Sequence, residues 1–221
     1  MVGRLTAPHI DRVAQKAFME LADAADKFER YPNPHASRIA RIADVIAREF
    51  HMASQDRESL RAAALMHDLG EVAMERNYIE RPGSLTDEER LDLARHPVIG
   101  EQECARAGAQ RPIQLLVRWH HEWWNGCGYP DALRGKEIPL AARILRLADT
   151  YAALTDARPY RAAIEEEEAR KKILDSAGVE FDPKVVQAFL ALPPFDELQS
   201  YASQRTIVPE PSWNLFSSFT K

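Results

Sequence analysis

The sequence predicts an all-α protein, and three observations support that prediction. Apolar residues recur three and four positions apart along alanine-rich stretches, as in Ile39, Ile42 and Ile46. No segment alternates apolar and polar residues in the way that a half-buried β-strand requires. Helix-breaking residues, among them Pro32 and Pro34, separate the periodic stretches. We therefore expect a helical bundle with an N-terminal helix and an irregular C-terminal tail.

The first expected helix covers residues 7–29. Its apolar positions follow a four-three spacing: Ala14, Phe18, Leu21, Ala25 and Phe28. About two heptads are too few to establish a coiled coil. Packing on the rest of the chain, dimerisation and a linker role therefore all stay open for this helix.

The later helices are delimited by capping signals. Gly70 is expected to end the third helix, and Thr86 and Glu89 form a capping box that opens the fourth. Residues 123–139 are expected to form a loop. Besides the first and the fourth, the expected helices cover residues 35–50, 55–69, 97–107, 112–122, 139–155, 165–177 and 183–192.

Length and composition bound the class of protein. The chain has 221 residues, of which 45% are hydrophobic and 29% charged, as is usual for a globular protein. We expect an N-terminal helical part at residues 1–30, a main domain at residues 31–192 and a Pro- and Ser-rich tail at residues 193–221.

No run approaches the ~20 apolar residues that crossing a membrane requires, and the N-terminus lacks the apolar core of a signal peptide. The expectation is a cytoplasmic protein without a membrane partner.

Charge and cysteine content narrow the partners. The net charge is −5 and no basic block stands out, so a nucleic-acid polymer is not an expected partner. The two cysteines, Cys104 and Cys127, are expected to be reduced thiols because no secretory signal is visible. A small anionic ligand remains compatible with this composition if a metal ion or another cation provides local positive charge.

Five of the seven histidines stand at the ends of apolar helical stripes or at a junction between helices. They are His35, His67, His96, His120 and His121. Because each continues or adjoins an inward-facing stripe, we expect these five imidazoles to face the interior. The other two histidines, His9 and His51, lack such a context and are expected on the surface.

Two aspartates, Asp68 and Asp149, share these inward-facing positions. A buried, unpaired carboxylate costs several kcal/mol, so both acids need a cation. Arg146 is an inward candidate three residues before Asp149, and an arginine could neutralise one acid, but an arginine does not explain the histidines. Imidazole and carboxylate ligands together favour iron, manganese or zinc. Seven ligands exceed one tetrahedral ion and suit two octahedral ions with a bridging aspartate.

Longer motifs stand in a fixed order between residue 35 and about residue 192. They are His35-Ala36-Ser37-Arg38, His67-Asp68-Leu69-Gly70, His96-Pro97-Val98-Ile99-Gly100, the stretch HHEWWNGCGYP at 120–130 and the stretch LRGKEIPLAARILRLADTYAALTDARPYR at 133–161. In this order the motifs resemble the HD-GYP family of the HD-domain metal-dependent phosphohydrolase superfamily. The resemblance covers most of the chain, and the intact GYP and RPYR blocks make it specific.

The resemblance implies a binuclear metal centre within an all-α HD fold. Matched position by position, one ion would be held by His35, His67, Asp68 and Asp149, and the other by Asp68, His96, His120 and His121. Asp68 would bridge the ions and is the expected catalytic residue. The two divalent ions would be iron or manganese, with zinc, nickel and magnesium as alternatives.

The resemblance also implies the reaction, which is hydrolysis of cyclic di-GMP to pGpG, and in some members to GMP, by a hydroxide between the metals. Tyr129, Arg158 and Arg161 would contact the substrate. Glu122 is expected to orient an imidazole or cap the chain rather than to bind metal. No sensor or receiver segment is recognisable, so control is expected from a sensor or receiver partner, from a homodimer formed through the N-terminal helix, or from an upstream part of a longer chain.

Departures from the family pattern leave a second hypothesis open. Glu71 stands where the family usually has a lysine beside the substrate phosphate, which places negative charge at an anion site. Tyr31 stands where three-metal members carry glutamate, so we expect two ions. Asn125 replaces an aspartate, which is a mild change. Because of Glu71, the alternative is a weakly active or inactive member that binds metal and acts as a cyclic dinucleotide receptor or signalling scaffold. A different HD phosphohydrolase activity fits the intact GYP and RPYR blocks less well.

Overall fold

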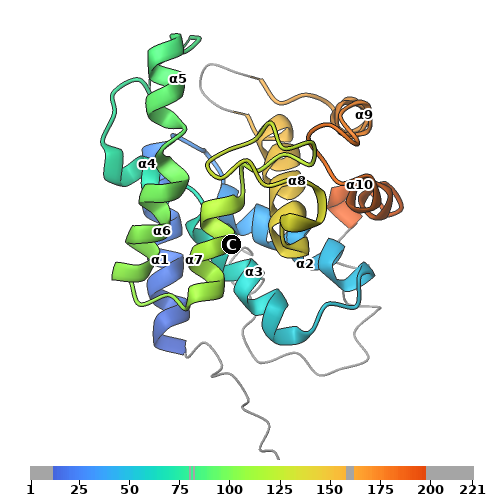
Figure 1. Ribbon diagram of the computed structural model, residues 1–221, viewed down its shortest axis with the longest axis horizontal. Coiled ribbons are helices and arrows are strands. Elements are labelled where there is room, and N and C mark those ends of the chain that lie inside the picture. Colours follow the sequence, from blue (N-terminus) through green and yellow to red (C-terminus); the bar gives the residue numbers. More distant parts are fainter. Residues whose placement is uncertain (1–11, 80, 82, 158–161, 198–221) are drawn as a thin grey trace, which may run out of the picture.

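The computed structural model describes residues 12–79, 81, 83–157 and 162–197 (Figure 1). Helices dominate it, and the β pairing among the described residues is an isolated bridge between Ala177 and Phe181. The expected all-α class is therefore confirmed. The helices are α1 (Arg12–Phe28), α2 (His35–Glu49), α3 (Ser54–Met66), α4 (Leu69–Met74), α5 (Asp87–Leu93), α6 (His96–Arg106), α7 (Arg111–Trp119), η1 (Gly135–Glu137), α8 (Leu140–Thr155), α9 (Glu166–Asp175), α10 (Pro183–Leu190) and η2 (Phe195–Glu197).

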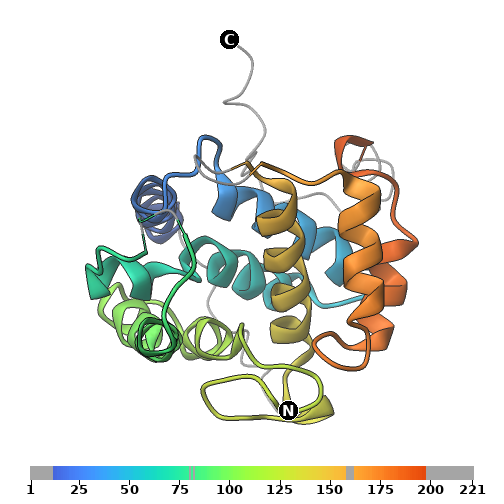
Figure 2. The same cartoon turned by 90° about the horizontal axis from the view of Figure 1, so that it is seen from above.

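Helix α2 lies in the middle of the fold and packs against α3 and α8. Its stripe of Ile39, Ile42 and Ile46 has no exposed surface, and each such side chain contributes about 1.5–3 kcal/mol by burial. In Figure 1, α1, α4, α6 and α7 lie to one side of this centre, and α9 and α10 lie to the other. Figure 2 shows the same division from above. The sequence periodicity of α2 thus places its first residue, His35, against the core.

Helix α1 packs on α3 and α4 of its own chain. Phe18 and Ala22 are buried in this contact, and Leu21 is partly buried. The apolar stripe predicted for this helix therefore has an intramolecular partner. Dimerisation through this helix stays a prediction. Residues 1–11 lie outside the described part of the chain, and so do residues 198–221, which hold most of the predicted C-terminal tail.

Gly70 does not end the third helix, contrary to the prediction. Helix α3 ends at Met66, and after His67 and Asp68 a new helix, α4, begins at Leu69 and includes Gly70. A Cβ atom on Gly70 would lie 2.0 Å from the backbone oxygen of His96, so glycine is needed for the close approach of α4 to α6. The break between α3 and α4 sets His67 and Asp68 at a helix junction.

The helix predicted over residues 112–122 is also shorter than expected. Helix α7 ends at Trp119, His120 keeps a helical backbone with φ −69° and ψ −12°, and His121 lies in the following turn. The prediction placed both histidines within one helix. In the structure His120 caps the end of α7, and His121 begins the following loop. The capping box of Thr86 and Glu89 is confirmed, with both of its hydrogen bonds formed.

Two further expectations concern the chain as a whole. Among the described helices, none combines the length and the apolar character that crossing a bilayer requires. Cys104 and Cys127 are unpaired, the first buried and the second exposed, which confirms the expectation of free thiols.

Candidate metal centre

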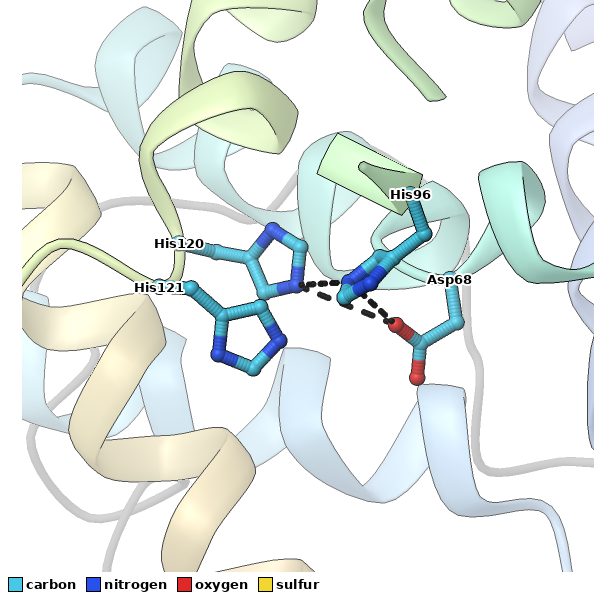
Figure 3. A group of neighbouring side chains, drawn as sticks. All are labelled: Asp68, His96, His120 and His121. Atoms are coloured by element: carbon cyan, nitrogen blue, oxygen red, sulfur yellow. Dashed lines mark hydrogen bonds and ion pairs between the residues drawn. The ribbon is translucent and has the colours of Figure 1, made fainter. Parts of the chain in front are cut away.

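The seven histidines and aspartates predicted to face inward converge on one place in the fold. They come from the start of α2, the break between α3 and α4, the start of α6, the turn after α7 and the second half of α8. We call His35, His67 and Asp149 the first cluster, and Asp68, His96, His120 and His121 the second cluster (Figure 3). Within each cluster the candidate ligand atoms lie within 4.8 Å of one another. Six of the seven side chains are buried, and His121 is half-buried.

Asp68 lies between the two clusters. Its Oδ2 atom is 2.9 Å from Nε2 of His67, which belongs to the first cluster. Its Oδ1 atom is 3.4 Å from Nε2 of His96 and 3.8 Å from Nε2 of His120, in the second cluster. The two oxygens of one carboxylate therefore face different clusters, which is the arrangement that a bridging ligand requires.

Three of the imidazoles are oriented by backbone carbonyls of helix ends. Nδ1 of His67 donates to Ala64, Nδ1 of His96 to Leu93 and Nδ1 of His120 to Val117, at 3.0, 2.8 and 2.6 Å. Each acceptor lies three residues earlier, in the last turn of a helix, where carbonyl oxygens lack a partner within the helix. Because Nδ1 donates to a carbonyl in each case, Nε2 is the ring nitrogen that faces the clusters.

The second cluster brings two of these Nε2 atoms together. Nε2 of His96 and Nε2 of His120 are 3.2 Å apart, and both Nδ1 atoms are already donating to carbonyls (Figure 3). Two neutral imidazoles in this tautomer present acceptor to acceptor, which is unfavourable unless a cation lies between or beside them. With Asp68 adjacent, this donor set of imidazole nitrogens and carboxylate oxygens fits a divalent transition metal.

The first cluster has a second layer of contacts that the sequence did not reveal. Nδ1 of His35 is 2.7 Å from Oδ2 of Asp156, and Nη1 of Arg38 donates to Oδ1 of Asp156 at 2.6 Å. The ring of Tyr31 stacks on His35, with centroids 3.7 Å apart and an interplanar angle of 10°. A carboxylate on Nδ1 fixes the imidazole so that Nε2 points toward the cluster, as outer partners of metal-binding histidines commonly do.

His67 of the first cluster and His96 of the second have pKa values shifted in opposite directions. Burial alone favours the neutral form of His67, but the carboxylate of Asp68 outweighs it and raises the pKa of His67 to about 10. Burial and the neighbouring His120 lower the pKa of His96 to about 4. The carboxyl group of Asp68 has its pKa well below the usual value, because the facing imidazoles outweigh the effect of burial. Strongly shifted groups at one place are typical of functional sites.

Glu71 lies beside this centre rather than pointing away from it. It is buried in the first turn of α4, and its carboxylate lies within 4.8 Å of candidate ligand atoms of Asp68 and Glu29. Its charge also raises the pKa of Tyr129, although burial contributes more to that shift. Glu71 therefore adds negative charge to the α4 side of the centre.

In its described contacts Glu122 binds the backbone rather than an imidazole. The carboxylate is buried and accepts hydrogen bonds from the backbone N–H groups of Asp131 and Leu133, at 2.7 and 2.9 Å. It therefore holds the loop that follows His121, which accords with the capping half of the prediction. Burial raises the pKa of Glu122 despite these donors.

The same loop carries Tyr129 to the second cluster. A Cβ atom on Gly128 would lie 2.2 Å from the backbone nitrogen of Trp123, so only glycine allows the loop to fold back here. Tyr129 then stacks on His121, with centroids 4.9 Å apart and an interplanar angle of 22°. The other two predicted substrate contacts, Arg158 and Arg161, lie outside the described residues.

Comparisons with known proteins agree with this geometry. A profile of the HD-domain family matches residues 19–185. The chain is 41% identical over 142 residues to a cyclic di-GMP phosphodiesterase of Vibrio cholerae, covering 61% of this chain and 29% of that protein. It is 33% identical over 184 residues to the cyclic di-GMP phosphodiesterase response regulator RpfG of Xanthomonas campestris, covering 82% and 48%. The chain thus spans less than half the length of either relative.

The fold also has a solved counterpart. The crystal structure of a cyclic GMP-AMP-specific phosphodiesterase of Vibrio cholerae superposes with a TM-score of 0.66 at 24% identity, covering 87% of this chain and 52% of that chain. At that identity the likeness concerns the fold. Together with the profile match over residues 19–185, it shows that the chain belongs to the HD-domain family, as its resemblance to HD-GYP members predicted.

Proposed function

We propose that the chain is a metal-dependent phosphodiesterase that hydrolyses cyclic di-GMP to pGpG, with GMP as the alternative final product. The observation that carries the proposal is the facing pair of His96 and His120, whose Nε2 atoms lie 3.2 Å apart beside the carboxylate of Asp68. The names of two relatives, which specify cyclic di-GMP, support the choice of substrate. The proposed cofactors are two divalent ions, iron or manganese, with zinc, nickel and magnesium as alternatives.

The proposed ligands follow the two clusters. One ion would be held by His35, His67, Asp68 and Asp149, and the other by Asp68, His96, His120 and His121. Two ions at such a site supply Lewis acidity, because they neutralise charge on phosphoryl oxygens and make a water molecule more acidic. Asp68 is the shared ligand, since each of its oxygens faces one cluster.

The chain's own groups orient these ligands and bind the substrate. The carbonyl oxygens of Ala64, Leu93 and Val117 hold the Nδ1 protons of three imidazoles and so keep each Nε2 atom available. Tyr129 lies over His121 and would contact the nucleotide at the rim of the second cluster. Arg158 and Arg161 remain predicted phosphate contacts.

One observation favours a second function, that of a cyclic dinucleotide receptor with little turnover. The buried carboxylate of Glu71 lies beside Asp68, where the family resemblance predicts a lysine at the substrate phosphate. Negative charge there opposes an anionic substrate by a few kcal/mol at an effective dielectric constant of about 20. Such a protein would bind metal and nucleotide but hydrolyse the nucleotide slowly.

Product analysis separates the two functions. Protein purified without air and loaded with iron or manganese is incubated with cyclic di-GMP, and pGpG and GMP are separated by chromatography. The same assay with 3′3′-cGAMP and cyclic di-AMP tests the choice of nucleotide. We expect pGpG to accumulate from cyclic di-GMP, and turnover to require the added metal.

Equilibrium dialysis against labelled cyclic di-GMP completes the test. Saturable binding without product would establish the receptor function instead of the enzyme. Neither product nor binding, in protein shown to carry metal, would contradict both functions.

A further inference from the structure

Arg146 points from α8 into the edge of the metal centre. Its side chain is 13% exposed, and Nη1 lies 3.0 Å from Nδ1 of His121 and 3.5 Å from Oδ2 of Asp149. Its Nη2 atom donates to the carboxylate of Glu180. One guanidinium group therefore contacts a residue from each of the two clusters.

The contact with His121 conflicts with the proposed role of that histidine as a ligand. A guanidinium group only donates, so Nδ1 of His121 must act as the acceptor. A neutral imidazole that binds a metal through Nε2 carries its proton on Nδ1 and cannot accept there. Figure 3 shows one ring nitrogen of His121 turned toward His96 and the other turned away. Binding of a metal by His121 through Nε2 therefore requires Arg146 to leave Nδ1.

The same competition applies to Asp149. The carboxylate of Asp149 would attract either Arg146 or a divalent ion, and a double charge exerts the stronger Coulomb attraction at equal distance. A bound ion in each cluster would thus release the Nη1 donors of Arg146 from His121 and Asp149.

Glu180 keeps the released guanidinium group close to the centre. The segment that carries Glu180 is fixed to the loop after His121, because Trp124 donates to the carbonyl of Glu180 and Asn125 to that of Val179, both at 3.0 Å. Tyr129 stacks on the same His121 ring that Arg146 contacts. Arg146 and Tyr129 therefore both border the second cluster.

From these contacts we propose that Arg146 is a phosphate-binding residue of this site, which supplies from α8 the positive charge that Glu71 fails to supply from α4. The proposal rests on the proposed function, since it takes a cyclic dinucleotide as the ligand. A planar guanidinium group binds two oxygens of a phosphate at once, which a lysine at the Glu71 position would not do. Arg146 would accordingly bind substrate after the metal ions have displaced it from His121 and Asp149.

The test compares Arg146→Gln with the wild type in two separate measurements. Titration of the full chain with Mn²⁺, followed by electron paramagnetic resonance of the free ion, gives the metal affinity. Steady-state hydrolysis of cyclic di-GMP gives kcat and KM. We expect KM to rise about 10- to 100-fold, the usual effect of losing a charged hydrogen bond, while Mn²⁺ binds as tightly as in the wild type or more tightly.

A matched control is Arg170→Gln. Arg170 is a similarly shielded arginine, with a side chain 18% exposed, and its ion pair with Glu166 lies outside both clusters. This variant should keep both the KM and the Mn²⁺ affinity of the wild type. The double variant Glu71→Lys with Arg146→Gln should recover part of the loss in KM, because a cation returns to the site from α4.

Each outcome decides the proposal. An unchanged KM in Arg146→Gln overturns it, and so does loss of Mn²⁺ binding together with activity, because Arg146 would then only support the ligands. If the glutamine variant melts below the assay temperature, Arg146→Met fills the same volume and is judged by the same two results. A wild type that neither binds nor hydrolyses cyclic di-GMP overturns the proposed function first, and the role of Arg146 with it.

Discussion

The first and second clusters use the same types of side chain in opposite electrostatic arrangements. His67 of the first cluster faces carboxylates, since it lies 3.8 Å from Asp149 of the same cluster and 2.9 Å from Asp68, which lies between the clusters. In the second cluster imidazoles face each other, with 3.2 Å between the Nε2 atoms of His96 and His120. The pKa of His67 is accordingly raised to about 10, and that of His96 is lowered to about 4.

The difference shows how far the charges within each cluster balance without a metal ion. A proton on His67 balances the charge of Asp68, so the first cluster has an internal substitute for a metal ion. The second cluster has no such substitute, because burial and mutual repulsion keep His96 neutral at pH 7. The second cluster therefore depends more strongly on a bound cation, while Asp68 couples both.

Removing Asp68 should have the largest effect, because it is the residue that the two clusters share. In Asp68→Ala we expect both ions to be lost and hydrolysis to fall by roughly 1000-fold or more. Elemental analysis of the purified protein measures the metal content. Asp182→Ala is the control, since Asp182 is also buried but caps α10 and pairs with Arg143. Full metal content in Asp68→Ala would contradict the bridging role.

Substituting one histidine from each cluster separates the two sites. We expect His96→Gln to lose the ion of the second cluster and His35→Gln to lose that of the first, so metal content falls from two ions to one in each. The remaining ion keeps all of its proposed ligands, because the substituted histidine belongs to the other ion. If both variants lose both ions, the clusters are one cooperative site and the comparison between them fails.

Asp156 tests the outer layer of the first cluster. Removing the carboxylate that holds Nδ1 of His35 should weaken metal binding at the first cluster about 10- to 100-fold and leave the second unchanged. Competition between Mn²⁺ and a chelator measures this in Asp156→Ala. Asp156→Asn keeps an acceptor for Nδ1 and should restore most of the affinity. Equal affinities in the alanine variant and the wild type would remove Asp156 from the orienting role.

Glu71→Lys should have the smallest effect on catalysis, and the informative result is whether activity rises or falls. Replacing a buried carboxylate beside Asp68 by a cation should lower KM and raise turnover, together about tenfold. Glu75→Lys makes the same charge change at an exposed position just after α4 and should leave both constants unaltered. An unchanged rate in Glu71→Lys would show that charge on the α4 side does not limit the reaction.

Most of the helices could be predicted from the sequence because the residues that define each helix lie close together along the chain. The isoleucine stripe of α2 and the capping box of Thr86 and Glu89 depend on residues within one or two turns, and both are confirmed. Gly70 was misread because glycine is a common helix terminator, whereas here it serves a contact with His96 in another helix. Capping by Glu122 accords with the sequence, but its particular partners do not follow from local pattern, since they are nine and eleven residues away.

The sequence by itself determined which side chains meet at the centre, because a histidine or aspartate that ends an apolar stripe is carried inward with that stripe. Only the tertiary structure decided how those side chains are oriented and what surrounds them. The pairing of His35 with Asp156 spans 121 residues, and that of Arg146 with His121 spans 25. Such contacts depend on how helices cross, and the spacing of residues along one helix carries no information about that crossing.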